Sequence, residues 1–96
     1  MRFEWDESKD LSNFRKHGIS FATATKVFED PDFVMLEDRE VDGEERWHTI
    51  GMVNGVMLLL VVHTYADEGQ SGEIVRILST RAVTPQERRR YEANTH

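Results

Sequence analysis

The sequence predicts an α+β domain in which helices pack against a mainly antiparallel sheet, in the order β-α-α-β-β-β-β-α. Three observations lead to this prediction. Asn54-Gly55 lies between two apolar runs and is a strong hairpin signal, because both turn residues need positive φ. Residues 56–62 are all apolar, which indicates a central strand covered on both faces. Thr84-Pro85 followed by Glu87 is typical of a helix start with a capping box.

The beginning of the chain predicts a short strand and a first helix. Phe3 and Trp5 alternate with charged residues, as in a strand with one buried face. Asp6 can cap a helix over residues 7–17, and Gly18 can end that helix in the left-handed conformation. The large aromatic side chains are expected to lie in the core; they are Trp5, Phe14, Phe21, Phe28 and Trp47.

A second helix and a short strand are predicted next. Ser20 is a second capping residue, and apolar residues recur behind it at helical spacing until Asp30-Pro31 ends the helix. Residues 33–36 form an apolar run of strand length. The charged segment 37–45 is expected to be a loop.

Three further strands are predicted at residues 46–53, 56–65 and 73–80. Strict alternation along the last of them places Arg76 on one face of the sheet and Arg81 on the other. A final helix begins at Pro85 and ends near residue 93. All the helices are expected on one side of the sheet.

The composition limits the class of protein. The 96 residues predict a single domain over the whole chain, 1–96. The absence of cysteine excludes disulfides and thiolate metal sites. No apolar run approaches the roughly 20 residues of a membrane helix, and no signal-peptide core is visible, so a cytoplasmic protein is expected. The four histidines lack a metal-ligand spacing, so neither a metal nor a cofactor is expected.

The net charge of −6 at first disfavours a nucleic-acid partner. The charge is unevenly distributed, however. Residues 21–45 carry nine acidic and two basic side chains, whereas residues 73–96 carry five basic and three acidic ones. Such asymmetry suits a protein with two partners of opposite charge.

A series of motifs runs through the chain from about Phe3 to Tyr91. They are Phe3-Glu4-Trp5-Asp6 with Lys9 and Asn13, Arg15-Lys16-His17-Gly18-Ile19-Ser20-Phe21, Val27-Phe28-Glu29-Asp30-Pro31, Gly43-Glu44-Glu45-Arg46-Trp47 with Ile50-Gly51, Arg76-Ile77-Leu78-Ser79-Thr80-Arg81, and Thr84 with Glu87-Arg88-Arg89-Arg90-Tyr91. In this order the motifs resemble the BrnT family of small RNA-cleaving toxins. The sequence departs from the family pattern at Thr80, where alanine is expected, and at the less basic Ala82-Val83.

This resemblance implies a RelE-like fold and a place in a type II toxin–antitoxin system. It implies RNA cleavage without a metal ion, and hence inhibition of translation. It also implies a cognate antitoxin of the ribbon-helix-helix type that neutralises the toxin, and a complex that contacts operator DNA only through the antitoxin and represses its own operon. The alternative is a non-catalytic, antitoxin-binding subunit of such an autoregulatory complex.

RNA cleavage without a metal uses the 2′-OH of the RNA as nucleophile, so it needs a base, a cationic donor and an acid on one surface. The candidate catalytic residues are Lys16, His17, Glu45, Arg46, His63, Arg81 and Tyr91, and the candidate RNA-binding residues are Arg76, Arg88 and Arg89.

Each candidate also has a structural interpretation. Lys16 and His17 could serve only to offset the dipole at a helix C-terminus, and Arg46 could form an ion pair. His63 could be a packing residue, and Tyr91 could anchor the last helix to the sheet. The three consecutive arginines point in different directions around a helix, so they could form a solvated surface.

Overall fold

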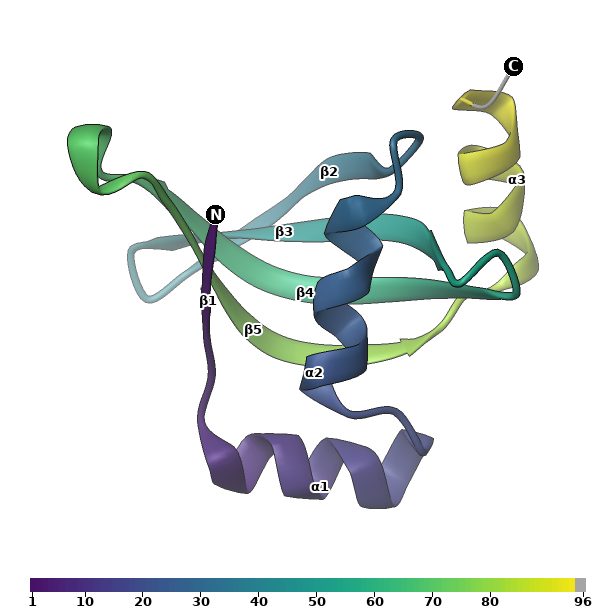
Figure 1. Ribbon diagram of the computed structural model, residues 1–96, viewed down its shortest axis with the longest axis horizontal. Helices are drawn as coiled ribbons and strands as arrows, with labels where there is room; N and C mark the ends of the chain where they lie inside the picture. Colours follow the sequence, from purple (N-terminus) through teal and green to yellow (C-terminus); the bar gives the residue numbers. More distant parts are fainter. Residues whose placement is uncertain (95–96) are drawn as a thin grey trace.

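The computed structural model describes residues 1–94. The predicted order of helices and strands is confirmed (Figure 1). The elements are β1 (Arg2–Glu4), α1 (Glu7–His17), α2 (Phe21–Ala24), the 3-10 helix η1 (Thr25–Glu29), β2 (Val34–Val41), β3 (Glu44–Val53), β4 (Met57–Asp67), the short 3-10 helix η2 (Gly69–Ser71), β5 (Glu73–Ala82) and α3 (Pro85–Asn94). No helix among these residues is long and apolar enough to cross a membrane.

The five strands form one sheet in the order β1-β5-β4-β3-β2. Only β1 and β5 pair in parallel, so the prediction of a mainly antiparallel sheet is confirmed. The apolar strand β4 lies in the middle, as its composition predicted. Its odd-numbered residues Leu59 and Val61 join one buried cluster, and its even-numbered residues Leu58 and Leu60 join another.

The two clusters identify two faces of the sheet. On the helix face, α2 and η1 contribute Phe21, Ala24 and Val27 to the core. On the opposite face, which we call the open face, Tyr91 of α3 packs with Ile50 and Leu60. The expectation that all helices lie on one side is therefore wrong. α3 lies at one end of the sheet (Figure 1). It leaves residues of the open face such as Arg76 exposed.

The helix boundaries follow the predicted caps. The Asp6 carboxylate accepts hydrogen bonds from the backbone N–H groups of Ser8 and Lys9, and Gly18 ends α1 at a φ of 72°. Thr84 and Glu87 form the reciprocal capping box of α3, at 2.9 and 3.2 Å. These local signals placed α1 and α3 correctly because they depend on residues only a few positions apart.

The expected loop over residues 37–45 is wrong, because β2 and β3 continue through it as a long hairpin. Only Asp42-Gly43 forms the turn, with φ of 53° and 79°. Asp-Gly is a two-residue hairpin signal of the same kind as Asn54-Gly55. The surrounding charge concealed it, since the strands here are exposed and carry no apolar alternation.

The predicted strict alternation of β5 is wrong, because this strand contains a β-bulge. Val62 pairs with Ser79, but the next residue, His63, pairs with Ile77, so Leu78 is the extra residue. The bulge reverses the alternation beyond it and turns Arg81 to the face that also carries Arg76. Thr80 turns instead toward the core, where it is fully buried.

α1 packs along the free edge of β5 through a polar residue. Asn13 is buried, and its side-chain amide donates to the carbonyl oxygen of Thr80 and accepts from the Thr80 N–H, at 3.0 and 3.1 Å. Asn13 thereby provides hydrogen-bond partners for backbone groups of β5 at an edge where no strand pairs with it. The expectation that Phe14 lies in the core is wrong, because this face of α1 points to solvent and leaves the side chain 52% exposed.

Candidate functional site

A shallow cleft between α1 and β5 brings together three of the predicted catalytic residues, Lys16, His17 and Arg81. Its other lining residues are Lys9, Ser12, Asn13, Leu78 and Ser79. None of the lining residues is an aspartate or a glutamate. The cleft is therefore suited to an anion.

Local structure places these side chains. Lys9 and Lys16 are seven positions apart, which is close to two helical turns, so they share one side of α1. His17 ends the helix beside Gly18. Arg81 reaches the cleft from the other side, at a position that the bulge in β5 determines.

Glu87 holds the Arg81 guanidinium in place. Nη1 and Nη2 of Arg81 donate to the two carboxylate oxygens at 2.8 and 2.9 Å, and Nη1 also donates to the Ala82 carbonyl at 3.2 Å. None of these bonds uses Nε, so Nε–H and the second Nη2–H remain as a parallel pair of donors. Such a pair matches the oxygens of a phosphate group.

The ion pair between Arg81 and Glu87 shifts the pKa values of both side chains. The hydrogen bond from Arg81 lowers the pKa of Glu87 to about 2. The pKa of Arg81 rises, mainly through its hydrogen bond to Glu87. Both side chains are therefore charged throughout the physiological range, and Arg81 has a fixed orientation.

The depressed pKa of Glu87 predicts a dependence of stability on pH. The Arg81–Glu87 pair stabilises the fold above the unfolded-state pKa of Glu87, near 4.5, and this stabilisation is lost as the pH falls toward 2. After allowance for solvent screening, we expect the Glu87→Gln variant to be about 1–2 kcal/mol less stable than the parent at neutral pH. Urea unfolding at neutral and acidic pH measures this difference, and a difference that does not shrink in acid would contradict the assignment.

Arg46 and Arg76 lie on the open face, on either side of β4. Arg76 pairs with Thr64 of β4, and Arg46 precedes Trp47, which pairs with His63. The Arg46 Nε is buried without a hydrogen-bond partner within residues 1–94. Arg76 is exposed and forms no ion pair within the described residues. Together with Arg81, these arginines place three cations on the open face, where Glu4 is the paired neighbour of Arg76; we call the three arginines the cationic band.

The structure separates Glu45 from the other candidates. Glu45 lies one residue before Arg46 in β3, so the two side chains project from opposite faces of the sheet. Glu45 is exposed and pairs across the hairpin with Glu40. It is not brought to the cleft.

His63 is a core residue and cannot reach a ligand at the surface. Its side chain is fully buried on the helix face and contacts the ring of Phe28. Nδ1 donates to the Thr64 carbonyl at 2.8 Å, so Nε2 is left to accept from the Thr49 hydroxyl at 2.6 Å. Burial lowers the pKa of His63, which favours this neutral form. His63 therefore has the surroundings of a packing residue, and it does not line the α1–β5 cleft.

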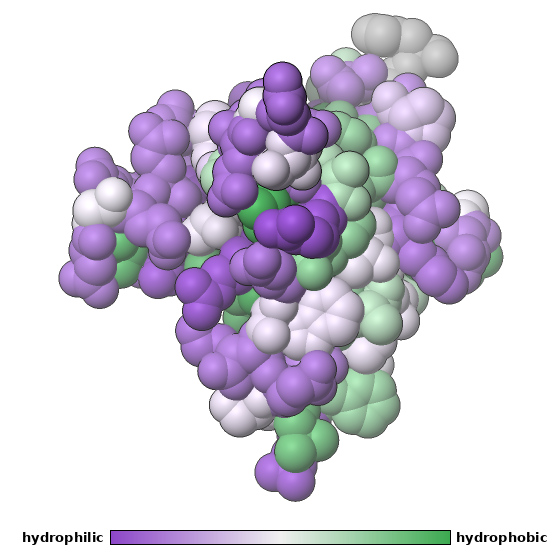
Figure 2. Space-filling model, turned by 60° about the vertical axis from the view of Figure 1, so that its left-hand side comes forward, coloured by the Kyte–Doolittle hydropathy of each residue, from purple (hydrophilic) through white to green (hydrophobic). Residues whose placement is uncertain are grey.

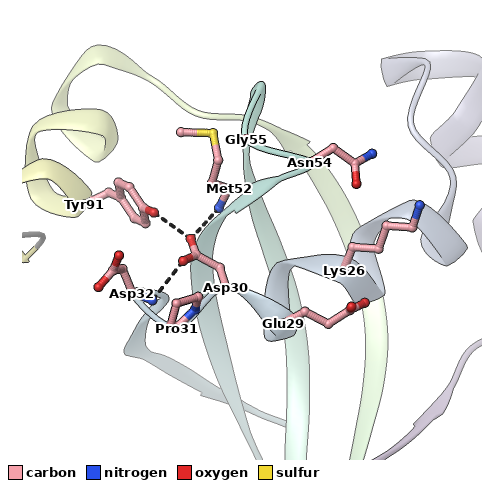
Figure 3. Close-up of a pocket in the computed structure, with 9 residues that line it drawn as sticks. All are labelled: Lys26, Glu29, Asp30, Pro31, Asp32, Met52, Asn54, Gly55 and Tyr91. Atoms are coloured by element: carbon pink, nitrogen blue, oxygen red, sulfur yellow. Dashed lines mark hydrogen bonds between the residues drawn. The ribbon is translucent and has the colours of Figure 1, made fainter.

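Tyr91 anchors α3 to the end of η1 (Figure 3). Its hydroxyl donates to Asp30 at 2.6 Å, and the same carboxylate accepts from the backbone N–H groups of Met52 and Asp32 at 2.7 and 2.8 Å. Burial, followed by the bond to Asp30, raises the pKa of Tyr91 to about 12. Tyr91 therefore lies away from the cleft, with its hydroxyl occupied.

The remaining candidates lie on α3. Arg88 and Arg89 are exposed. Arg89 lines a second groove, whose floor contains Leu36 and Ile50 of the sheet. Neither arginine lines the α1–β5 cleft.

Sequence reasoning did not name several residues of the site as candidates: Lys9, Ser12, Asn13, Leu78 and Ser79 line the cleft, and Glu87 pairs with Arg81. Ser79 enters the cleft only because of the bulge, which no local pattern signals. Glu87 was interpreted as a capping residue alone, although it also pairs with Arg81. Among residues 1–94, no three His, Cys, Asp or Glu side chains are placed so that they could hold a metal ion.

Comparisons with known proteins identify the family. The family model described as "Ribonuclease toxin, BrnT, of type II toxin-antitoxin system" matches residues 5–87. The crystal structure of the Brucella abortus ribonuclease toxin BrnT is similar, with a TM-score of 0.63 and 24% sequence identity over 88% of this chain and 97% of that one. A comparison with curated protein sequences found no match. The match over residues 5–87 shows that the chain belongs to the BrnT family of ribonuclease toxins of type II toxin–antitoxin systems.

Proposed function

We propose that this toxin is a metal-independent endoribonuclease that inhibits translation and acts at the α1–β5 cleft. The observation that carries the proposal is the meeting of Lys16, His17 and Arg81 in a cleft lined by no carboxylate. RNA carries its own nucleophile, so the protein needs to move protons and stabilise the charge on the phosphate. The cleft offers side chains for both tasks.

In this mechanism His17 exchanges protons with the reacting oxygens. Imidazole can accept a proton from the 2′-OH and can supply one to the leaving 5′-oxygen near neutral pH. The free donors of Arg81, Nε–H and Nη2–H, bind two phosphate oxygens, and the Lys16 ammonium adds positive charge. The open-face arginines Arg46 and Arg76 bind the RNA backbone beyond the cleaved bond.

The proposal includes a partner, as expected of a type II toxin. A cognate antitoxin of the ribbon-helix-helix type neutralises the toxin, and operator DNA is contacted only through that antitoxin. The uneven charge of the chain supports two separate binding surfaces, one for RNA and one for a protein.

The experiment that tests this function is expression of the chain in bacteria, first alone and then together with the protein encoded by the adjacent gene. We expect growth arrest and fragmented RNA from the chain alone, and recovery on co-expression. Normal growth with intact RNA, despite a folded protein that binds its neighbour tightly, would instead favour a non-catalytic subunit of a DNA-binding complex.

The role assigned to Tyr91 gives a separate prediction. Replacing it with Phe removes one hydrogen bond to a charged group, so we expect a loss of about 1–2 kcal/mol of unfolding free energy. Cleavage of RNA by the folded variant should stay within about twofold of the parent, because the hydroxyl does not reach the cleft. Thermal unfolding and an RNA cleavage assay measure the two effects. A stable Tyr91→Phe protein without activity would assign the hydroxyl a catalytic role.

A further inference from the structure

The helices do not cover the whole helix face of the sheet. The uncovered part carries a pocket that the proposed RNA cleavage does not use. Its walls are the side chains of Phe28, Phe33, Met35, Trp47 and Tyr65, with Met1 and the carboxylate of Glu73 completing it. The pocket is largely apolar, and Glu73 is its only acidic or basic side chain. The Tyr65 hydroxyl donates to the Glu73 carboxylate and fixes its position.

Acidic side chains surround this pocket on the same face of the sheet. Glu37 lies directly opposite Trp47 in the strand register, so both project from the helix face. Glu45 is two residues from Trp47 in β3, and Asp67 is two residues from Tyr65 in β4, so both acidic side chains also project from the helix face. No Lys or Arg occupies a paired position of the helix face at this end; the exposed Arg39 lies in the irregular stretch between Glu37 and Glu40. Figure 2 looks toward this end and shows hydrophilic residues with a hydrophobic area between them.

Two cross-strand pairs of carboxylates at this end of the sheet are unfavourable in the isolated chain. Glu40 lies directly opposite Glu45, and Asp67 lies directly opposite Glu73. Like charges at directly opposed positions of neighbouring strands destabilise a sheet. None of the four carboxylates forms an ion pair with a Lys, Arg or His within residues 1–94. A partner that brings positive charge would relieve this repulsion.

We infer that this acidic aromatic surface, defined by the pocket and by Glu37, Glu40, Glu45 and Asp67, is a docking site for a basic segment of the antitoxin, with a Lys or Arg side chain in the pocket. Aromatic rings attract such a cation through their π faces, and Glu73 supplies the counter-charge. The surface disfavours RNA because it would place phosphates beside carboxylates. The inference rests on the proposed function for the identity of the partner.

The surfaces proposed for the two partners, RNA and antitoxin, lie on opposite faces of the sheet. The cationic band of Arg46, Arg76 and Arg81 lies on the open face, whereas the acidic aromatic surface lies on the helix face. Substitutions at one surface can therefore change one interaction without removing the other. This independence makes the inference testable apart from the proposed function.

The test compares the affinity of the purified full-length chain for the protein encoded by the adjacent gene, measured by calorimetry, with RNA cleavage by the same preparations. The variants are Glu73→Gln, which keeps the shape of the pocket, and Glu45→Lys, which reverses an exposed charge. Glu7→Lys, an exposed charge reversal on α1, is the matched control. We expect each surface variant to weaken binding by about tenfold or more, with a smaller effect at high salt, while the control changes little.

The outcomes separate the two claims. Weakened binding with RNA cleavage unchanged supports the docking site. Binding within about twofold of the parent for both variants overturns it, and so does a change in RNA cleavage without a change in binding, which would make the pocket an RNA site. The complete absence of binding by the parent chain would also overturn it. Absence of RNA cleavage by the parent chain would instead refute the proposed enzymatic function, whatever the affinities are.

Discussion

An Arg81→Ala variant is expected to lose about 10²–10³-fold in the rate of RNA cleavage while remaining folded, because one fixed donor to a developing oxyanion contributes roughly that much. Arg81 is the cation of the cleft whose orientation is fixed by hydrogen bonds, to Glu87 and to the Ala82 carbonyl. The rate of cleavage of a labelled RNA by purified protein measures the effect, and circular dichroism checks the fold.

Two further variants define the origin of this effect. Arg81→Lys keeps the charge but loses the paired donors, so we expect it to restore only part of the activity. Lys26→Ala removes an exposed cation outside the cleft and should leave the rate unchanged. Full activity of Arg81→Ala, or an equal loss in Lys26→Ala, would contradict the assignment of the cleft as the active site.

A Gly51→Ala variant is expected to lose about 3 kcal/mol of unfolding free energy, because small-to-large changes in close-packed cores typically have costs of this order. A Cβ atom at Gly51 would lie 2.7 Å from Cγ1 of Val27 and 2.8 Å from the Val27 carbonyl oxygen. The methyl group of Val27 could rotate away, but the backbone of η1 would have to move. Urea unfolding of the two proteins measures the loss.

Conformational preference alone predicts the opposite sign for this substitution. Glycine within a strand is less favourable than alanine by roughly 0.5–1 kcal/mol. A variant as stable as the parent would therefore show that η1 does not pack against β3 as closely as the structure indicates. The position also explains why the Ile50-Gly51 motif carries a glycine, since the close approach of η1 leaves no room for a side chain.

The features that the sequence predicted best depend on residues near one another in the chain. The caps at Asp6, Gly18 and Thr84 placed two helices correctly, and the apolar composition of residues 56–62 identified the central strand. The prediction failed where pairing between strands decides the outcome. The bulge at Leu78 is determined by the register of β4 and β5, and it moved Arg81 to the other face.

For the candidate site, too, some features could be predicted from the sequence and others depend on the folded chain. Lys16, His17 and Arg81 were named from the sequence, and the structure places them around one cleft. Glu45, His63 and Tyr91 were named for their chemistry alone, which is the same for an exposed, a buried or an already bonded side chain. Burial and hydrogen-bond partners distinguish these states, and both are properties of the folded chain.

The purified toxin incubated with RNA in the presence of EDTA provides the most direct test of metal-independent cleavage through the 2′-OH. We expect fragments that carry 2′,3′-cyclic phosphate and 5′-hydroxyl ends, at the same rate with and without the chelator. Fragments with 5′-phosphate ends, or cleavage that stops in EDTA and returns with added Mg²⁺, would contradict this account.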